Sequence, residues 1–504
     1  MNIVHERPGP LGEALQANTP LKAFSLFFPR SLLLEIVVST NVKILALRRQ
    51  YKEQRTENDQ TEIEEMQAFI GLLIFSAYRK DNHLSTREMF CPKKGSPFYR
   101  ATMSEKRFVF LLTCLRFDDM HTREERRKED KFAPIRTIWD ILIASCEIYY
   151  SPGSLLTVDE QLLGFRGHCP FRMYIANKPA KYGIKIVINC DAQSYYMLKG
   201  IPYLGKTGTR PEPGMNLGHT FTKQLTLKYH NTNRNVTVDN WFTSVPLILD
   251  LLRNCGMTLL GTVRANKKEI PAIMNSKVDR KPGSCAFLYT KDITLLSFKP
   301  ASSKKKNKKN VNLMSSFHFD SSLKDTGRPI MVDDYNRTKG GVDTFDQMCS
   351  TYSTSRKTKR WPMRVFYGMI NIATINAYII YCENYQRENS ENNDNKVMDR
   401  KQFMDELATS LAKPWAAKRI SQPRLRRDLK TTIVGVFDIP TIPIDHDMLA
   451  VANQRGTKTR CQVCTYQMDR KTKIKCVVCH KPVCGSHYYP MCEVCAIDRN
   501  DSNA

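Results

Sequence analysis

The chain lacks the two features that would direct it into or across a membrane. Its first residues, MNIVHERPGP, contain no cationic head followed by an apolar stretch, so we expect no secretory signal. The longest apolar stretch, AFIGLLIFSAY at residues 68–78, is shorter than the about 20 residues that a membrane-spanning helix needs. We therefore expect a soluble intracellular protein with no membrane partner.

The chain has fewer acidic residues than basic ones. The chain carries 77 Lys and Arg against 50 Asp and Glu, which gives a formal net charge of +27. This is more positive charge than solubility requires, so we expect a polyanionic partner, with nucleic acid the first candidate. Apolar residues make up 41% of the 504 residues, which favours a folded protein of two to four domains.

The apolar pattern changes several times along the chain. Residues 20–150 have helical periodicity, and Thr61 with Glu64 predicts a capping box at the start of one helix. From residue 155, short runs such as LLTVDEQ, YGIKIVINCD and NVTVDN predict a mixed sheet. Residues 266–335 are turn-rich and contain a basic loop, KKKNKK, at 304–309. Helical periodicity returns over 361–385 and 401–413, and 431–458 is expected to be a linker.

Four acids lie at places where a fold would display them. Asp159 lies on or at the end of a strand, and Asp239 lies where a strand meets a helix. Asp343 and Asp346 are three residues apart, which places both on one face of a helix, and the Gly-Gly pair before them is expected to let the chain turn sharply. Carboxylates suit Mg²⁺, and two ions about 4 Å apart promote phosphodiester chemistry. The simpler interpretation is that each acid is a turn or cap residue.

The C-terminal region is rich in cysteine. Of 16 cysteines, seven fall between residues 461 and 495, in pairs of C-x2-C or C-x2-H spacing that predict two tetrahedral zinc sites. The order of the pairs favours a cross-brace, with sequential pairing as the alternative. The cross-brace would place Cys461, Cys464, Cys484 and His487 on one zinc, and Cys476, Cys479, Cys492 and Cys495 on the other.

Four ordered segments carry a resemblance to a known family. They are LRFDD (115–119), the 156–186 segment that begins LTVDEQLLGFRG, NVTVDNWFTS (235–244) and YNRTKGGVDTFDQMCSTYSTSRKTKRWPM (335–363). Together they resemble the piggyBac family of DNA transposases, and the resemblance extends over about residues 10–497.

The resemblance implies an α+β multidomain fold, with an RNase H-like mixed-sheet catalytic domain that an insertion interrupts. A split helical dimerisation and DNA-binding domain would flank it, and a cross-brace zinc domain would follow. The implied boundaries are 1–154 (first helical segment), 155–265 (first catalytic segment), 266–335 (insertion), 336–352 (second catalytic segment), 353–430 (second helical segment), 431–458 (linker) and 459–497 (zinc domain).

The resemblance also implies a reaction. Asp159, Asp239 and Asp343 match the family's three essential aspartates, and Asp346 matches a fourth acid, so these four would hold two Mg²⁺ ions, with Mn²⁺ as a substitute. The expected activity is cut-and-paste transposition: strand nicking, hairpin formation at the transposon ends and 3′-OH transfer into TTAA, with excision that leaves no scar. The expected partners are double-stranded DNA, as terminal inverted repeats and TTAA target, and a second copy of the chain. The expected location is the nucleus.

Basic residues predict DNA contacts in three places, although a run of charge is usually a solvated face. The resemblance places Trp361 near the cleaved end, where its ring would stack on an unpaired base; the alternative is a core anchor at a helix start. The predicted DNA-binding residues are Arg356, Lys357, Lys359, Arg360 and Trp361; Lys418, Arg419, Arg424, Arg426 and Arg427; and Arg470 and Lys471.

Two other hypotheses compete with an active transposase. The first is a host-adopted DNA-binding protein that kept the fold and lost transposition, although all four acids are present. The second is a chromatin reader led by the zinc region, as a PHD- or RING-like module would be. The second does not account for the acids, and the basic flanks of the cysteine pairs favour DNA.

Overall fold

The computed structural model describes residues 4–51, 55–205, 208–209, 211, 213, 215–274, 280–301, 310–389, 396–422, 425–439, 458–476 and 481–487. The chain divides into two compact units, Met1–Trp415 and Ala416–Ala504. The KKKNKK loop, Arg424, Cys479, Cys492 and Cys495 lie outside the described residues.

Helices dominate the first 150 residues, as predicted. Thr19 caps α1 by accepting a hydrogen bond from the Lys22 amide, and Pro20 follows at a position where its missing N–H costs nothing. α3 is apolar on nearly all sides because its neighbours surround it. The helices are α1 (Pro20–Ser25), α2 (Arg30–Arg48), α3 (Ile63–Tyr78), α4 (Thr86–Met89), α5 (Pro97–Thr102), α6 (Glu105–Cys114), α7 (Arg123–Glu129) and α8 (Arg136–Ile148).

The predicted capping box at the start of α3 does not form. Glu62 occupies the N-cap, and the Thr61 hydroxyl donates instead to the Glu65 carboxylate at 2.8 Å. Glu65 is buried and also accepts from Arg107, whose guanidinium further donates to the backbone carbonyls of Glu57 and Asp59. The buried ion pair of Glu65 and Arg107 outweighs the local preference for a capping box, because a buried carboxylate without a partner would lower the stability of the fold.

In the part of the chain that the structure describes, a nine-stranded mixed sheet follows the helices. Its order is β4-β5-β3-β7-β8-β11-β10-β9, and β6 pairs with β5 on the side. β3, β7 and β8 are parallel to one another, whereas the other pairs are antiparallel. The strands are β3 (Leu155–Gly164), β4 (Met173–Tyr174), β5 (Tyr182–Asp191), β6 (Met197–Pro202), β7 (Asn235–Val238), β8 (Thr258–Val263), β9 (Cys285–Tyr289), β10 (Thr294–Phe298) and β11 (Val311–Ser315).

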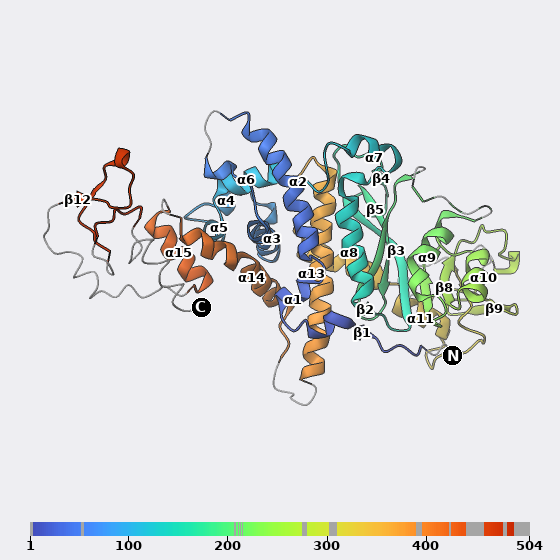
Figure 1. Ribbon diagram of the computed structural model, residues 1–504. Coiled ribbons are helices and arrows are strands. Elements are labelled where there is room, and N and C mark those ends of the chain that lie inside the picture. The colour runs from blue at the N-terminus through green and yellow to red at the C-terminus, as the bar shows by residue number, and fades with distance from the viewer. Residues whose placement is uncertain are drawn as a thin grey trace. The chain divides into compact units, whose positions relative to one another are not determined.

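The turn-rich region after residue 266 contributes to the same sheet. β9, β10 and β11 form an antiparallel ladder, and β11 pairs with β8, with Leu313 opposite Thr262. A short separate pair joins β1 (Gly9–Pro10) to β2 (Tyr150–Ser151). The sheet core and its covering helices are seen in Figure 1, where α9 (Leu217–Thr226), α10 (Val245–Asn254) and α11 (Ile330–Thr338) lie beside the green strands.

One helix is longer than the 361–385 segment that the sequence pattern predicts. α13 (Trp361–Glu388) meets the length and composition of a membrane span, which the 68–78 stretch does not. However, 89% of its apolar window is buried inside the protein, where it contacts α1, α8, α12 and β3. Burial of this kind is expected for the central helix of a core.

Helices also continue beyond α13. α14 (Arg400–Ile420) covers the predicted 401–413 helix, and α15 (Arg427–Phe437) extends into the segment expected to be a linker. Ile433 and Phe437 are buried in α15. The packing of these two apolar side chains therefore stabilises the helix, although the segment is too short for its hydrophobic periodicity to be recognised in the sequence. The last described elements are the short strands β12 (Thr459–Arg460) and β13 (Lys471–Thr472).

A two-residue turn, Lys339 and Gly340, follows α11 where the sequence predicts a turn, but it does not use the left-handed backbone that glycine allows. Gly340 is the N-cap of α12 (Gly341–Thr351) with φ −83°, and neither glycine has a positive φ. Gly341 is needed for another reason. A Cβ at this position would lie 2.5 Å from Thr157 Oγ1, so α12 approaches β3 as closely as a glycine allows.

We predict that Gly341→Ala is damaging whereas Gly340→Ala is tolerated. The added methyl at 341 would overlap Thr157, and we expect the free energy of unfolding to fall by about 1–3 kcal/mol. At 340 the nearest atom would be Thr344 Oγ1 at 3.8 Å, so the change should stay within about 0.5 kcal/mol. Urea denaturation of both variants measures the difference, and equal stabilities would contradict the close approach.

Candidate active site and DNA-binding surface

The fold brings two of the four predicted acids side by side. β3 and β7 are parallel neighbours, and Val158 pairs with Val238, so Asp159 and Asp239 follow at matching positions on adjacent strands. Neighbouring strands lie about 4.8 Å apart, which sets the separation of the two backbones. Asp159 accepts a hydrogen bond from the Glu160 amide at 2.7 Å, and Asp239 accepts one from the Trp241 amide at 2.8 Å.

α12 brings the other two acids over the same region. This helix packs on β3 and β5. Asp346 accepts from the Gln161 side chain at 3.0 Å, and Asp343 lies 3.6 Å from the Lys178 ammonium. Asp346 is mostly buried, whereas the Asp343 side chain is 69% exposed and is therefore the member of the set open to solvent.

The site disfavours its own negative charge. Burial raises the pKa of Asp159 well above its ordinary value, and Glu160 and Asp239 add to the effect by repulsion. Burial likewise raises the pKa of Asp239 and that of Asp346. Lys178 offsets only part of this charge, and a group of carboxylates with excess negative charge is the donor set that fits hard divalent cations. The residues of the site therefore fit the metal requirement that the sequence predicts.

Three residues that no sequence motif singles out complete this region. Lys178 contacts both β3 and α12. It donates to the Glu160 carbonyl of β3 at 3.0 Å and lies near the Asp343 carboxylate of α12. Burial would lower the pKa of Lys178, but the surrounding carboxylates, Asp159 first, raise it. Gln161 orients Asp346, and Lys185 lies 3.7 Å from Glu160. No local pattern marks these residues because their neighbours come from distant segments of the chain.

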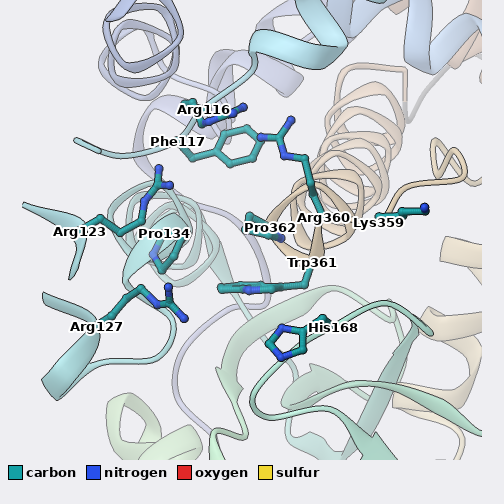
Figure 2. A pocket seen from close by; sticks show the side chains of 10 residues that line it. All are labelled: Arg116, Phe117, Arg123, Arg127, Pro134, His168, Lys359, Arg360, Trp361 and Pro362. Carbon is teal, nitrogen blue, oxygen red and sulfur yellow. The ribbon is translucent and has the colours of Figure 1, made fainter. Parts of the chain in front are cut away.

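A basic cavity of about 390 Å³ lies where the N-terminus of α13 meets the helical region. Five of its ten lining residues are Arg or Lys and none is acidic, and the Trp361 ring forms part of the wall (Figure 2). His168 also lines the cavity, in the segment that follows β3, the strand that carries Asp159. One continuous segment therefore joins Asp159 to the cavity wall. The lining residues are Arg116, Phe117, Arg123, Arg127, Pro134, His168, Lys359, Arg360, Trp361 and Pro362.

Trp361 is a packed residue as well as a cavity wall. Its ring centroid lies 5.7 Å from that of Phe132 and 5.0 Å from that of Phe171, and 9% of the residue is exposed. The structure thus supports the core-anchor interpretation and leaves one side of the ring at the cavity. Stacking on an unpaired base stays a prediction.

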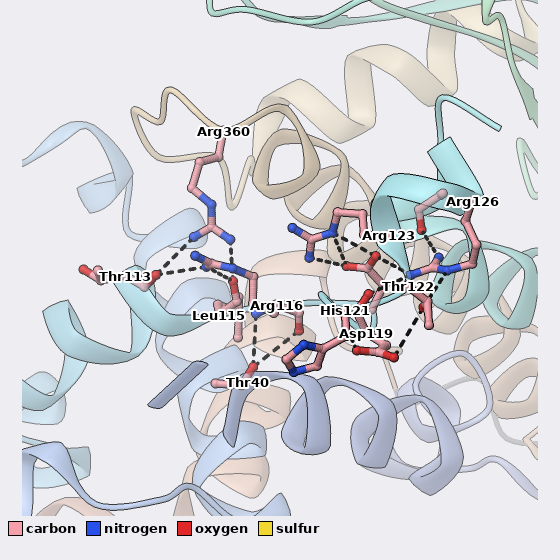
Figure 3. Close-up of polar contacts among 12 residues, drawn as sticks. Thr40, Thr113, Leu115, Arg116, Asp119, His121, Thr122, Arg123, Arg126 and Arg360 are labelled. Atoms are coloured by element: carbon pink, nitrogen blue, oxygen red, sulfur yellow. Dashed lines mark hydrogen bonds and ion pairs between the residues drawn. The ribbon is translucent and has the colours of Figure 1, made fainter. Parts of the chain in front are cut away.

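Two arginines of the cavity are held by the end of α6. Arg116 and Arg360 both donate to carbonyls of residues 112–115 (Figure 3), where the last turn of a helix leaves carbonyls without intrahelical partners. Burial lowers the pKa of Arg360 to about 10, and repulsion by Arg116 adds to this effect. The cavity therefore concentrates positive charge that an anion would offset.

The predicted basic residues are not equivalent. Arg356 donates to the Leu84 carbonyl at 3.0 Å, whereas Lys357 and Lys359 are exposed. In the second unit Arg419 is buried and Arg426 forms an ion pair with Asp428 at 2.8 Å. Lys418 lies in α14, Arg427 begins α15, Lys471 lies in β13, and Arg470 donates to the Ser486 hydroxyl. Their DNA contacts stay predictions.

The first predicted zinc set comes together in the structure. Cys461, Cys464, Cys484 and His487 offer four ligand atoms that all lie within 4.8 Å of one another. The Sγ atoms of Cys464 and Cys484 are 3.6 Å apart, and each is 3.5 Å from His487 Nδ1. A tetrahedral zinc requires about 3.8 Å between sulfurs and about 3.5 Å between sulfur and nitrogen.

This grouping is the one that the cross-brace requires. Cys476 is buried but is not a member of the group, and its three predicted co-ligands lie outside the described residues. Burial alone would raise the pKa of the Cys461 thiol, but backbone N–H groups, that of Cys484 first, lower it to about 7. A thiol that ionises easily is suited to zinc. Among the described residues the four aspartates do not form so tight a group.

We predict that Cys484→Ser removes about one zinc ion per chain, because three ligands hold zinc more weakly than four. Elemental analysis of the purified protein measures the loss. Cys91→Ser is the matched control, since Cys91 is a partly exposed thiol of the first unit and should leave the zinc content unchanged. Equal zinc in both variants would contradict the site.

Comparison with known proteins identifies the family of the chain. A family model described as Transposase IS4 matches residues 19–378. Two human proteins, "PiggyBac transposable element-derived protein 3" and "Chimeric ERCC6-PGBD3 protein", are each 24% identical over 328 residues, or 59% of this chain. The chain spans 51% of the first relative and 29% of the second.

A solved structure is similar over nearly the whole chain. It is described as "Cryo-EM structure of piggyBac transposase synaptic complex with hairpin DNA", and it is 42% identical with a TM-score of 0.82. The match covers 97% of this chain and 100% of that one. With the family model matching most of the chain, the protein belongs to the Transposase IS4 family and, within it, to the piggyBac-type transposases.

Proposed function

We propose that the protein is a DDD-type DNA transposase that excises and inserts a DNA element by metal-dependent phosphodiester chemistry. The observation that carries this proposal is the register of β3 and β7, which sets Asp159 beside Asp239, with α12 bringing Asp343 and Asp346 to the same place. The sheet is proposed to be RNase H-like. In this proposal the steps are strand nicking, hairpin formation and transfer of the 3′-OH to TTAA, with excision that leaves no scar.

The four aspartates would hold two Mg²⁺ ions, for which Mn²⁺ would substitute. Bound there, the ions would supply activation of the attacking oxygen and stabilisation of the leaving one. The protein's own residues orient the carboxylates and balance their charge. Gln161 orients Asp346, the Glu160 and Trp241 amides orient Asp159 and Asp239, and Lys178 balances the charge around Asp343.

The DNA partner follows from the charge of the chain. The net charge of +27 and the basic cavity suit a phosphate backbone, whose proposed source is the terminal inverted repeats and the TTAA target. The relative with hairpin DNA supports this choice of partner. We further propose that two copies act together on two ends, that two Zn²⁺ ions fold the C-terminal region for DNA binding, and that the protein works in the nucleus.

Excision of a plasmid-borne element with candidate ends tests the activity. We predict that Asp239→Asn lowers excision by about a thousandfold or more, because a neutral amide would hold a divalent cation more weakly than the carboxylate would, and the proposed reaction depends on that cation. The variant should bind DNA as well as the unaltered protein in a fluorescence anisotropy titration.

Asp325→Asn is the control for this substitution. Asp325 is an exposed acid in a turn between β11 and α11, so its loss removes the same charge without touching the site. If the unaltered protein binds DNA yet excises no element under these conditions, the protein is a DNA-binding relative without transposition, and the proposed activity is wrong.

The basic cavity yields a separate prediction. We expect Lys359→Ala to weaken DNA binding and to reduce the slope of log K against log salt by about 0.9, the value for one phosphate contact. Arg360→Ala should instead lower the free energy of unfolding by about 1–3 kcal/mol, because carbonyls at the end of α6 lose their partner. Anisotropy at several salt concentrations and urea denaturation separate the two effects. An unchanged salt slope for Lys359→Ala would place this lysine outside the DNA contact.

A further inference from the structure

We infer that Thr338 is a positioning residue for the reaction, because its hydroxyl and its carbonyl bind β7 and β3. These contacts hold the segment that leads to Asp343 and Asp346 against β3, which contains Asp159, and β7, which ends one residue before Asp239. This inference rests on the proposed function. It concerns a residue that lies outside the acidic set, five positions before Asp343, at the last residue of α11.

Three buried threonines form the link, here called the threonine clasp and made of Thr157, Thr237 and Thr338. Thr157 Oγ1 donates to the Thr338 carbonyl at 2.7 Å. The hydroxyls of Thr237 and Thr338 are 2.7 Å apart, and Thr338 Oγ1 is 2.7 Å from the Asp334 carbonyl. All three residues are at most 2% exposed.

The hydroxyl protons can be assigned without conflict. Each hydroxyl has one proton to donate. Thr157 gives its proton to the Thr338 carbonyl, and Thr338 gives its own to the Asp334 carbonyl. Thr237 is then the donor in its contact with Thr338. Every donor of the clasp is therefore used, and removal of one hydroxyl leaves a buried polar group without its partner.

The clasp lies next to the acids on the sheet. Thr157 pairs with Thr237 in the parallel ladder, and each lies two residues before an acid, Asp159 or Asp239. Residues two apart on a strand project from the same face, so the clasp and the acids share the face on which α12 packs. A separation of two residues is about 6.6 Å along a strand.

The clasp also sets how closely α12 lies on the sheet. Thr157, which donates to Thr338, is the residue that a Cβ on Gly341 would strike. Thr338 therefore fixes the chain three residues before the closest approach of α12 to β3. A shift of this segment would move Asp343 and Asp346 relative to Asp159 and Asp239. Misplacement by about 1 Å is enough to cost roughly a hundredfold in rate.

α11 is fastened at a second place as well. His318 lies after β11, and its Nε2 is 3.0 Å from the Asp334 carboxylate while its Nδ1 is 2.9 Å from the Ser315 hydroxyl. Asp334 thus joins α11 to the end of β11, and its carbonyl receives the Thr338 hydroxyl. The contact of Asp334 with His318 holds α11 independently of Thr338. Loss of the Thr338 hydroxyl should therefore loosen the segment between α11 and α12 while α11 stays in place.

Thr338→Val tests the clasp because valine keeps the shape and removes the hydroxyl. We expect the excision rate at saturating DNA to fall by about 10- to 100-fold while the affinity for DNA stays within about twofold. The Mg²⁺ concentration that gives half of the maximal rate should rise several-fold. Thr338→Ser keeps the hydroxyl and should restore the rate to within about threefold.

A measurement that needs no activity accompanies the rate. Mn²⁺ binding is followed by water-proton relaxation, with the Asp239→Asn variant subtracted to remove ions bound elsewhere. We expect Thr338→Val to weaken the Asp239-dependent binding by about tenfold, in the range found for residues that orient metal ligands. Thr102→Val is the control, since Thr102 is equally buried and its hydroxyl donates to the Phe98 carbonyl inside α5.

The outcomes separate the clasp from the proposed function. If the unaltered protein excises no element, the proposed activity fails, and the Mn²⁺ titration still decides the clasp. If Thr338→Val matches the unaltered protein in rate and in Mn²⁺ affinity, the proposed positioning role of the clasp is wrong. If Thr338→Val does not fold, Thr157→Val removes one bond of the same clasp and is held to the same rate and Mn²⁺ criteria. A Thr338→Ser variant as impaired as Thr338→Val would also overturn the role of the hydroxyl.

Discussion

The parallel pairing of β3 with β7 is the constraint on which the candidate active site depends. It joins segments about 80 residues apart in the chain and sets Val158 opposite Val238. Because side chains alternate along a strand, a slip of one residue would turn either acid to the other face. The remaining elements of the site, α12 above and Lys178 beside it, are placed relative to this pair of strands.

Electrostatics explains why the acids and the basic surface belong together. Burial and mutual repulsion raise the pKa values of Asp159, Asp239 and Asp346, so the folded protein disfavours their combined charge. The cavity beside Trp361 has the opposite imbalance, with five cations and no acid in its lining. Divalent cations would offset the first and DNA phosphates the second. Lys178 near Asp343 and the Arg123–Asp118 ion pair offset part of these charges, and ligands of opposite charge would offset more.

The stretch TKGGVDTFDQMCSTYSTSRKTKRWP (338–362) contributes to the structure in four separate ways. Gly341 allows the close approach of α12 to Thr157, Asp343 and Asp346 face the sheet region, and Arg356 and Arg360 bind carbonyls of the helical region. Trp361 then anchors α13 against Phe132 and Phe171. Much of the positive charge in this stretch therefore stabilises the fold, while Lys357 and Lys359 remain exposed.

The sequence by itself determined the elements whose signals are local. β5 has the predicted bounds, 182–191, because a short run rich in β-branched residues between turn residues specifies a strand. The acids, the zinc ligand pairs and the family were also recognisable, since each depends on residue type and short spacing. Only the tertiary structure decided which local preferences prevailed. Glu65 binds Arg107, so that no capping box forms, and β9, β10 and β11 extend the main sheet. Thr157 donates to Thr338, which lies 181 positions away in the chain. Such contacts follow from packing between distant segments, which no local pattern encodes.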